Sequence, residues 1–223
     1  MNGAAASPLA VAVLVSGRGS NMAAIARSCA NGDINARIVR VIADRPSAAG
    51  IELAQELGLK ASVVPARQFA DRSAFEAALQ SEIEASGARL VVLAGFMRIL
   101  SEEFAARHAG AMLNIHPSLL PNFTGLHTHE RVLAAGESEH GASVHFVTAT
   151  LDGGPLLRQV RVPVLPGDTP ESLSARVQAA EHIIYPEVIR WIADGRLQLI
   201  DGMPRLDGRP LLQPVVTSQE IHQ

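Results

Sequence analysis

The stretch "ARLVVLAGF", residues 88–96, is the part of the sequence that decides the fold. Residues 90–94 are apolar without interruption, so a strand formed here would bury both of its faces. Strands buried on both faces are typical of parallel sheets with helices on either side. The stretch therefore predicts a strand of a parallel sheet.

The segments around this stretch alternate between strand and helix patterns. Short apolar runs such as "LAVAVLVS" and "ARIVRVIAD" are separated by amphipathic stretches, among them "RSAFEAALQSEIEASG" at residues 72–87. After residue 138 the pattern changes to two extended segments, "HGASVHFVTATLDGG" and "GPLLRQVRVPVL". We expect an α/β fold whose doubly wound, mostly parallel sheet has an antiparallel C-terminal portion.

A long helix is expected to close the domain. The stretch "TPESLSARVQAAEHIIYPEVIRWIADG", residues 169–195, offers Thr169 as N-cap and Gly195 as C-terminal stop, and Pro186 should kink or split the helix. The prolines and Asp-Gly pairs of the last residues predict a surface hairpin and a loose end. We therefore expect a single domain over residues 1–202 and a hairpin and tail over residues 203–223.

Composition restricts the classes of function. The 223 residues are 48% hydrophobic and carry a formal charge of -3, which does not favour nucleic acid as a partner. No apolar stretch approaches the roughly 20 residues that span a bilayer, so no membrane association is expected. The lone Cys29 fits a reducing compartment, and we expect a cytoplasmic protein. Four histidines lie close together in the sequence: His127, His129, His140 and His145. They have no recognisable metal-ligand spacing, so no metal site is expected.

A candidate phosphate loop lies between the first strand and the first helix. In "SGRGSN", residues 16–21, two glycines allow backbone amides to face an anion, and Ser20 and Asn21 can donate further hydrogen bonds. The alternative is an ordinary turn with Ser20 as N-cap. A Walker loop is excluded because no Gly-Lys-Ser/Thr occurs. A dinucleotide site is disfavoured by Met22 at the third glycine position, although Asp44 at the end of the second strand keeps it open.

Candidate catalytic residues follow two later strands. In "NIHPSLLP", residues 114–121, Asn114 and His116 should point to the same side at the carboxyl edge of the sheet. The alternative is structural, with Asn114 capping the strand and His116 stacking under Pro117. The turn "TATLDGGP" adds Asp152. An amide, an imidazole and a carboxylate can transfer an acyl group to an amine without a covalent nucleophile. A serine hydrolase is disfavoured, since no Gly-x-Ser-x-Gly occurs.

The chain resembles the folate-dependent formyltransferases, most closely those that act on glycinamide ribonucleotide. The resemblance covers residues 10–202 and rests on motifs in the family's order: "SGRGSN", "VVLAGFMRIL", "LNIHPSLLP", "GLHTH", "EHGASVHFVT", "LDGGP" and "RVQAAEHIIYP". It implies a Rossmann-like formyltransferase fold and a role in de novo purine biosynthesis. The implied reaction moves a formyl group from 10-formyltetrahydrofolate, a co-substrate, to the ribonucleotide amine by direct attack through a tetrahedral intermediate. It implies no metal, only small-molecule substrates, and a monomer or homodimer.

The resemblance also implies roles for particular residues. Asn114, His116 and Asp152 match the catalytic trio: His116 as imidazolium and Asn114 would stabilise the oxyanion, and Asp152 would organise a water that moves the amine proton. The ribonucleotide, held largely by the N-terminal half, would contact Gly19, Ser20, Asn21, Gln178 and Glu181. The folate, held largely by the C-terminal half, would contact Arg72, Met97, Arg98, Ile99, Leu100, Asn114, Thr148, Ala149, Thr150, Leu151 and Asp152.

Two residues depart from the family pattern, and other functions stay open. Thr124 stands where the family often has proline, which puts the stiffness of its loop in question. Ala149 stands where an acid is common, which does the same for the order of the folate loop. A methionyl-tRNA formyltransferase would need an added C-terminal domain, and a formyltetrahydrofolate hydrolase an added N-terminal one. A dehydrogenase would bind nicotinamide at "SGRGSN". A binding protein with a decayed site would bind ligands without turnover.

Overall fold

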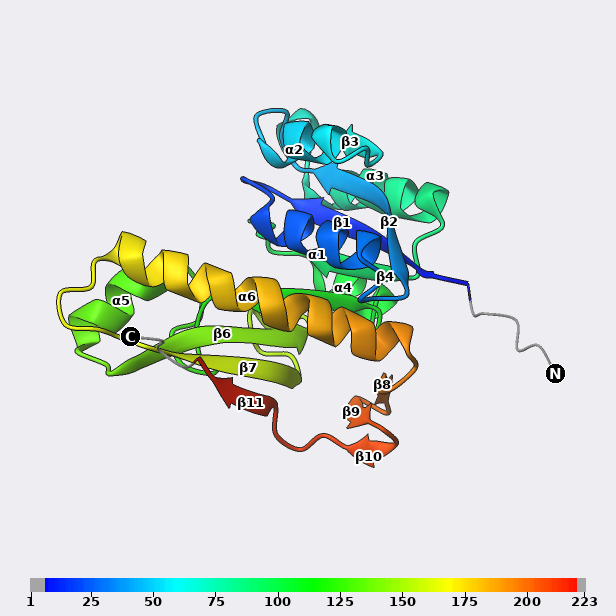
Figure 1. Ribbon diagram of the computed structural model, residues 1–223. Coiled ribbons are helices and arrows are strands. Elements are labelled where there is room, and N and C mark those ends of the chain that lie inside the picture. Colours follow the sequence, from blue (N-terminus) through cyan, green and yellow to red (C-terminus); the bar gives the residue numbers. More distant parts are fainter. Residues whose placement is uncertain (1–6, 220–223) are drawn as a thin grey trace.

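The chain forms an eight-stranded sheet with helices on both faces (Figure 1). The computed structural model describes residues 7–219. The strand order is β11-β7-β6-β5-β4-β1-β2-β3. These strands are β1 (Leu9–Val15), β2 (Ala36–Ala43), β3 (Ala61–Val63), β4 (Leu90–Leu93), β5 (Met112–His116), β6 (Glu139–Phe146), β7 (Leu156–Pro163) and β11 (Val215–Ser218). A separate three-stranded sheet contains β8 (Leu197–Ile200), β9 (Met203–Leu206) and β10 (Arg209–Pro210).

The pairing confirms the predicted fold class. Strands β1 to β5 pair in parallel, β1 lying between β2 and β4. Strand β6 is antiparallel to both β5 and β7, which gives the antiparallel C-terminal portion. Because β1, β2, β4 and β5 run in one direction, their carboxyl ends meet at one edge of the sheet, and the loops that follow them lie close together.

Two apolar cores lie on the two faces of the sheet. The helices are α1 (Ser20–Ala30), α2 (Gly50–Glu56), α3 (Arg72–Ser86), α4 (Glu102–Arg107), α5 (Thr128–Ala135) and α6 (Pro170–Ala193), with a 3-10 turn η1 (Ala66–Gln68). Strand β4 shows how both faces are used: Leu90 and Val92 pack in the core with α1 and α6, while Val91 and Leu93 pack in the core with α3 and α4. All four residues are buried, so the prediction that this strand buries both faces is confirmed.

Helix α6 crosses the face of the antiparallel strands β6 and β7 and continues past α1 (Figure 1). The predicted ends are confirmed, since Thr169 forms a capping box with Ser172 and Gly195 takes a left-handed φ of 71° just after the helix. Of the predicted kink or split at Pro186, the split does not occur, because the helix continues through this residue. Pro186 lacks the N–H that would bond one turn back, but buried neighbours such as Tyr185 and Val188 hold the helix on the sheet.

The C-terminal residues are more ordered than the sequence suggested. Strands β8, β9 and β10 form a small antiparallel sheet, but β11 does not belong to a loose end, because it pairs in parallel with β7. The buried Arg158 guanidinium reinforces this pairing by donating to the Val215 carbonyl at 3.1 Å and the Thr217 hydroxyl at 3.1 Å. Residues 1–6 of the expected domain and 220–223 of the expected tail lie outside the described residues.

A buried tyrosine fixes α6 to the centre of the sheet. The Tyr185 hydroxyl donates toward the carbonyls of Leu93 at 2.9 Å and Leu113 at 3.1 Å, where β4 and β5 approach the carboxyl edge. Its side chain is fully buried. The hydroxyl therefore sets the position of α6 along two strands that lead to this edge.

We expect Tyr185→Phe to destabilise the protein, because it removes a buried hydrogen-bond donor and leaves two carbonyl oxygens without the hydroxyl that they accept from. The loss should be about 1–3 kcal/mol in the free energy of unfolding. Urea unfolding followed by circular dichroism would measure it. A variant as stable as the parent would show that the hydroxyl does not fix the helix.

Candidate active site

A cavity of about 900 Å³ opens at the carboxyl edge of the sheet. Its wall comes from the loops after β1, β4, β5 and β6 and from one side of α6. Among the residues predicted for the site, those that line the cavity are Gly19, Ser20, Asn21, Met97, Arg98, Ile99, Leu100, Asn114, His116, Thr148, Ala149, Thr150, Leu151, Asp152, Gln178 and Glu181. The structure thus brings together segments that lie far apart in the sequence.

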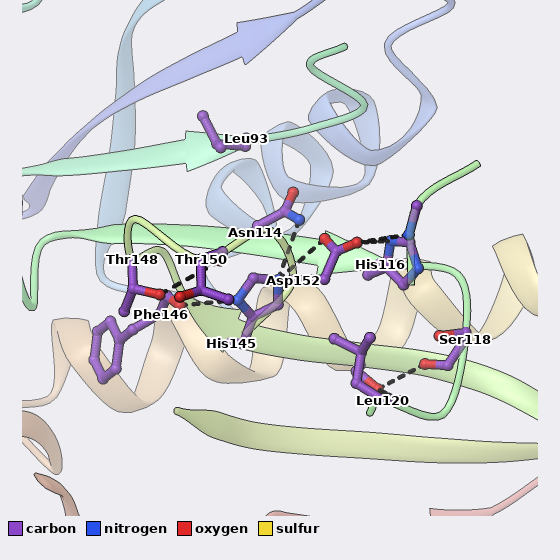
Figure 2. Close-up of polar contacts among 12 residues, drawn as sticks. Leu93, Asn114, His116, Ser118, Leu120, His145, Phe146, Thr148, Thr150 and Asp152 are labelled. Atoms are coloured by element: carbon purple, nitrogen blue, oxygen red, sulfur yellow. Dashed lines mark hydrogen bonds and ion pairs between the residues drawn. The ribbon is translucent and has the colours of Figure 1, made fainter. Parts of the chain in front are cut away.

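The predicted trio meets at the inner wall of this cavity (Figure 2). Side chains alternate along β5, and Leu113 and Ile115 face the core under α6. Asn114 and His116 therefore lie together on the opposite side of the strand. The His116 Nδ1 is 3.5 Å from Asp152 Oδ2. On its other side His116 Nε2 is 3.0 Å from the Phe123 carbonyl, so Nε2 carries a proton and donates it there. The imidazole is therefore oriented by two groups, with Nδ1 toward the carboxylate.

His145 joins the trio, and the sequence did not predict this. It lies directly opposite Asn114 in the β5–β6 pair, and Asn114 Nδ2 is 3.2 Å from His145 Nε2. His145 Nδ1 is 2.8 Å from the Phe146 carbonyl, which makes Nε2 the acceptor for the Asn114 amide. Burial, more than its other surroundings, lowers the pKa of His145 and favours this neutral form. The histidine thus fixes which way the Asn114 amide faces.

Close backbone packing positions Asp152. This residue has a left-handed φ of 52°, which aspartate tolerates better than most residues, and its Oδ2 accepts a 2.9 Å hydrogen bond from the Gly125 N–H. Two residues later, at Gly154, a Cβ would lie 1.8 Å from the Phe146 carbonyl oxygen. Only glycine fits there, so the "LDGGP" turn returns the chain close to β6 and directs the carboxylate into the cavity.

The loop after β5 is tied to the antiparallel strands by buried polar groups. The Ser143 hydroxyl donates to the Ser118 carbonyl and accepts from the Leu120 N–H at 3.0 Å. The Gln159 amide donates to the Leu120 carbonyl and to Ser143, both at 2.8 Å. This network fixes the path of the chain toward Phe123, whose carbonyl orients His116.

The "SGRGSN" loop forms the opposite end of the cavity. Gly19 has a φ of 78°, and a Cβ there would lie 2.9 Å from the Gly50 Cα, so the turn depends on glycine. Ser20 is the first residue of α1 and not its N-cap, contrary to the alternative of an ordinary capped turn. Asn21 donates a 2.8 Å hydrogen bond to Glu181 on α6. Burial raises the pKa of Glu181 to about 7, and the Asn21 bond only partly offsets this.

The predicted folate side is apolar and exposed. Met97 and Ile99 are 61% and 63% exposed although they are large hydrophobic residues, and Leu151 faces the same cavity. Ala149, one of the departures from the family pattern, is exposed in the cavity wall. Thr124, the other, accepts a 2.6 Å hydrogen bond from Arg131 through its carbonyl. This surface suits a flat, partly apolar ligand.

The structure does not bring Arg72 to the cavity. This arginine is the first residue of α3, its side chain is 62% exposed, and its Nε is 4.0 Å from Glu76. Its predicted contact with the folate stays a prediction. Arg45, which the sequence did not single out, does line the cavity.

The geometry argues against a dinucleotide site. Met22 fills the space under α1 and is fully buried, where a third glycine would be needed for a close approach. The Asp44 carboxylate, the group that would bind a ribose, is bonded to the guanidinium groups of Arg45 at 3.1 Å and Arg98 at 2.7 Å. Asp44 therefore does not present a free carboxylate to a nucleotide.

Two further histidines form a neutral pair beside the site. His129 Nδ1 is 3.0 Å from His140 Nε2, a distance that requires one ring to donate and the other to accept. Burial lowers the pKa of His140 to about 4, and the charges of the nearby His129 and His116 add to this effect. Within residues 7–219, no three His, Cys, Asp or Glu side chains are grouped so as to hold a metal ion. No helix in the same range is long and apolar enough to cross a membrane.

The pKa of Glu181 gives a prediction about stability. The folded-state pKa of about 7 lies above the ordinary 4.5, so this group stabilises the fold below about pH 4.5 and loses that contribution as the pH rises through about 7. Glu181→Gln keeps an acceptor for Asn21 but removes the titration. As the pH rises from about 5 to about 8, the free energy of unfolding of the variant, relative to that of the parent, should increase by about 1–3 kcal/mol. Urea unfolding at both pH values would measure the difference, and a difference independent of pH would contradict this.

Known proteins resemble the chain over nearly its full length. Residues 9–189 match the formyl transferase family. The chain is 47% identical to the phosphoribosylglycinamide formyltransferase of Escherichia coli over 90% of this chain and 95% of that protein. It is 41% identical to the Haemophilus influenzae protein of the same name, with the same coverage. The solved structure of phosphoribosylglycinamide formyltransferase from Coxiella burnetii superposes with a TM-score of 0.90 at 48% identity, covering 94% of this chain and 99% of that one. The chain therefore belongs to the formyl transferase family, and within it to the phosphoribosylglycinamide formyltransferases.

Proposed function

We propose that the chain transfers a formyl group from 10-formyltetrahydrofolate to the amine of glycinamide ribonucleotide, a step of de novo purine biosynthesis. The observation that supports this most directly is the meeting of Asn114, His116 and Asp152 between a glycine loop at a helix start and an apolar, exposed surface. A phosphate suits the first and a pterin the second. The identity with formyltransferases over nearly the whole chain supports the same conclusion.

The reaction requires no covalent enzyme intermediate. The ribonucleotide amine attacks the formyl carbon, a C–N bond forms, and the carbonyl electrons move to the oxygen. Protonated His116, through Nδ1–H because Nε2–H bonds the Phe123 carbonyl, and the Asn114 amide donate hydrogen bonds to this oxyanion. Asp152, through a water, takes the proton that the amine loses. When the intermediate collapses, the bond to N10 of the folate breaks, and that nitrogen takes a proton delivered from His116.

The binding residues divide between the two substrates. The N–H groups at the start of α1, with Gly19, Ser20 and Asn21, would hold the ribonucleotide phosphate. Gln178 and Glu181 are three apart on α6 and face the cavity together, where the Glu181 carboxylate can accept hydrogen bonds from ribose hydroxyls. The folate would lie along residues 97–100 and 148–152. The cytoplasmic location and the choice between monomer and homodimer stay predictions.

An absorbance assay of folate deformylation tests the proposed function. The purified chain should convert 10-formyltetrahydrofolate to tetrahydrofolate only when glycinamide ribonucleotide is added, with one formylated ribonucleotide formed for each folate consumed. Formate release without the ribonucleotide would instead indicate a hydrolase. Binding of both substrates without any conversion would indicate a decayed site.

His116→Ala and Asp152→Asn should each lower kcat by about two orders of magnitude or more, with modest changes in KM. Both changes remove groups that act on charge developing in the transition state, not on the ground state. Steady-state kinetics with each substrate varied in turn would measure the effect. Near-normal turnover in both variants would reject the roles given to these residues.

Ser20→Ala should weaken binding of the ribonucleotide by about fivefold to tenfold and leave folate binding unchanged, because it removes one donor to the phosphate. Calorimetry with each ligand separately would measure this. Ser28→Ala, on the same helix but outside the cavity wall, is the matched control and should change neither affinity. A loss of folate affinity alone in Ser20→Ala would mean that the two pockets are reversed.

A further inference from the structure

The segment 96–101 has a defined path although it forms neither helix nor strand. Polar contacts hold it at three of its residues. The Met97 N–H donates to the Ser16 hydroxyl at 2.8 Å, the Arg98 Nε to Asp44 at 2.7 Å, and the Ser101 N–H to Glu76 at 2.7 Å. These contacts allow Met97 and Ile99 to stay exposed in the cavity wall while the backbone between them is fixed.

Of the three residues that accept these hydrogen bonds, Asp44 alone bonds a charged side chain of the segment, the guanidinium of Arg98. Its own side chain is fully buried at the end of β2, and it accepts from Arg98 at 2.7 Å and from Arg45 at 3.1 Å. Burial opposes ionisation of Asp44, but the hydrogen bonds from Arg45, Arg98 and Ser16 outweigh it and hold its pKa below the ordinary value. One buried carboxylate thus orients two guanidinium groups.

Both arginines face the cavity. Their side chains are 43% exposed for Arg45 and 38% for Arg98, and both line the wall. Within the part of the chain that the structure describes, Arg98 bonds only Asp44, through Nε, so its two Nη groups remain available for a ligand. Arg72, the arginine expected from the sequence to meet the anionic end of the folate, lies outside this wall.

We propose that Asp44 is a positioning residue for folate binding, which holds Arg98, with Arg45 beside it, so that their guanidinium groups meet the carboxylates of the folate's glutamate. This inference rests on the proposed function, since it takes the folate as the ligand of residues 97–100. The ligand chemistry follows from the site: two cations share one buried anion, so one positive charge is left to attract a carboxylate at the cavity rim. Asp44 itself touches no substrate.

Asp44→Asn tests the inference. The amide has nearly the shape of the carboxylate but no charge, so the two guanidinium groups repel each other and lose their common anchor. We expect the Kd and KM for 10-formyltetrahydrofolate to rise by about tenfold or more. The Kd for the ribonucleotide and kcat at saturating folate should change by less than about twofold.

Asp168→Asn is the matched control. Asp168 is also a buried carboxylate bonded to an arginine, with two contacts of 2.8 Å to Arg176 and a side chain that is 4% exposed, but it lies outside the cavity wall. The control should lower the melting temperature without changing either Kd. If Asp44→Asn behaves like this control, its role is structural and the inference is overturned.

A double-mutant cycle shows whether Asp44 acts through Arg98. Arg98→Ala should weaken folate binding, and adding Asp44→Asn to it should weaken binding little further, because the residue to be positioned is gone. A folate analogue that ends at the benzoate ring should bind the parent and Asp44→Asn equally. Additive effects in the cycle, or an equal loss for the truncated analogue, would overturn the inference. A parent protein that binds no folate in calorimetry would instead refute the proposed function.

Discussion

The hydrogen bonds from the Tyr185 hydroxyl to the carbonyls of Leu93 and Leu113 fix the geometry on which the site depends. Helix α6 carries Gln178 and Glu181, while β4 leads toward residues 97–100 and β5 carries Asn114 and His116. A shift of α6 along the sheet would therefore move the ribonucleotide side of the cavity relative to the folate side. Since the reacting atoms of the two substrates must meet within bonding distance, this registration is a condition for the proposed chemistry.

Local patterns predicted the frame of the site, and long-range pairing set the rest. The apolar run at residues 90–94 specified a strand buried on both faces, and the two-residue spacing of Asn114 and His116 placed them on one side of β5. His145 was not recognised as a partner of Asn114, because their pairing depends on the antiparallel register of β5 and β6, and the long connection over residues 117–138 gives no local signal of that register. The pairing of β11 with β7 was missed for a similar reason, since the arginine that supports it lies far away in the sequence.

Two buried carboxylates at the edge of the cavity show how their partners decide their state. Asp44 is bonded to two guanidinium groups, which outweigh its burial and keep it charged. Glu181 has the Asn21 amide as its hydrogen-bond donor, so burial prevails and raises its pKa to about 7. The Asp44 carboxylate thus has its charged partners without a ligand. The Glu181 carboxylate gains most from a ligand that brings hydroxyl donors, which agrees with a ribose bound beside α6.

The central claim is that Asn114, His116 and Asp152 act on one carbon atom between the two substrates. A crystal structure with a stable bisubstrate analogue, in which a tetrahedral carbon joins the ribonucleotide to a folate analogue, tests it most directly. The account predicts that the oxygen on this carbon lies within hydrogen-bond distance of His116 and Asn114, with the phosphate at the start of α1 and the pterin along residues 148–152. An analogue bound with its tetrahedral carbon away from these side chains, or with its two ends exchanged, would contradict the account.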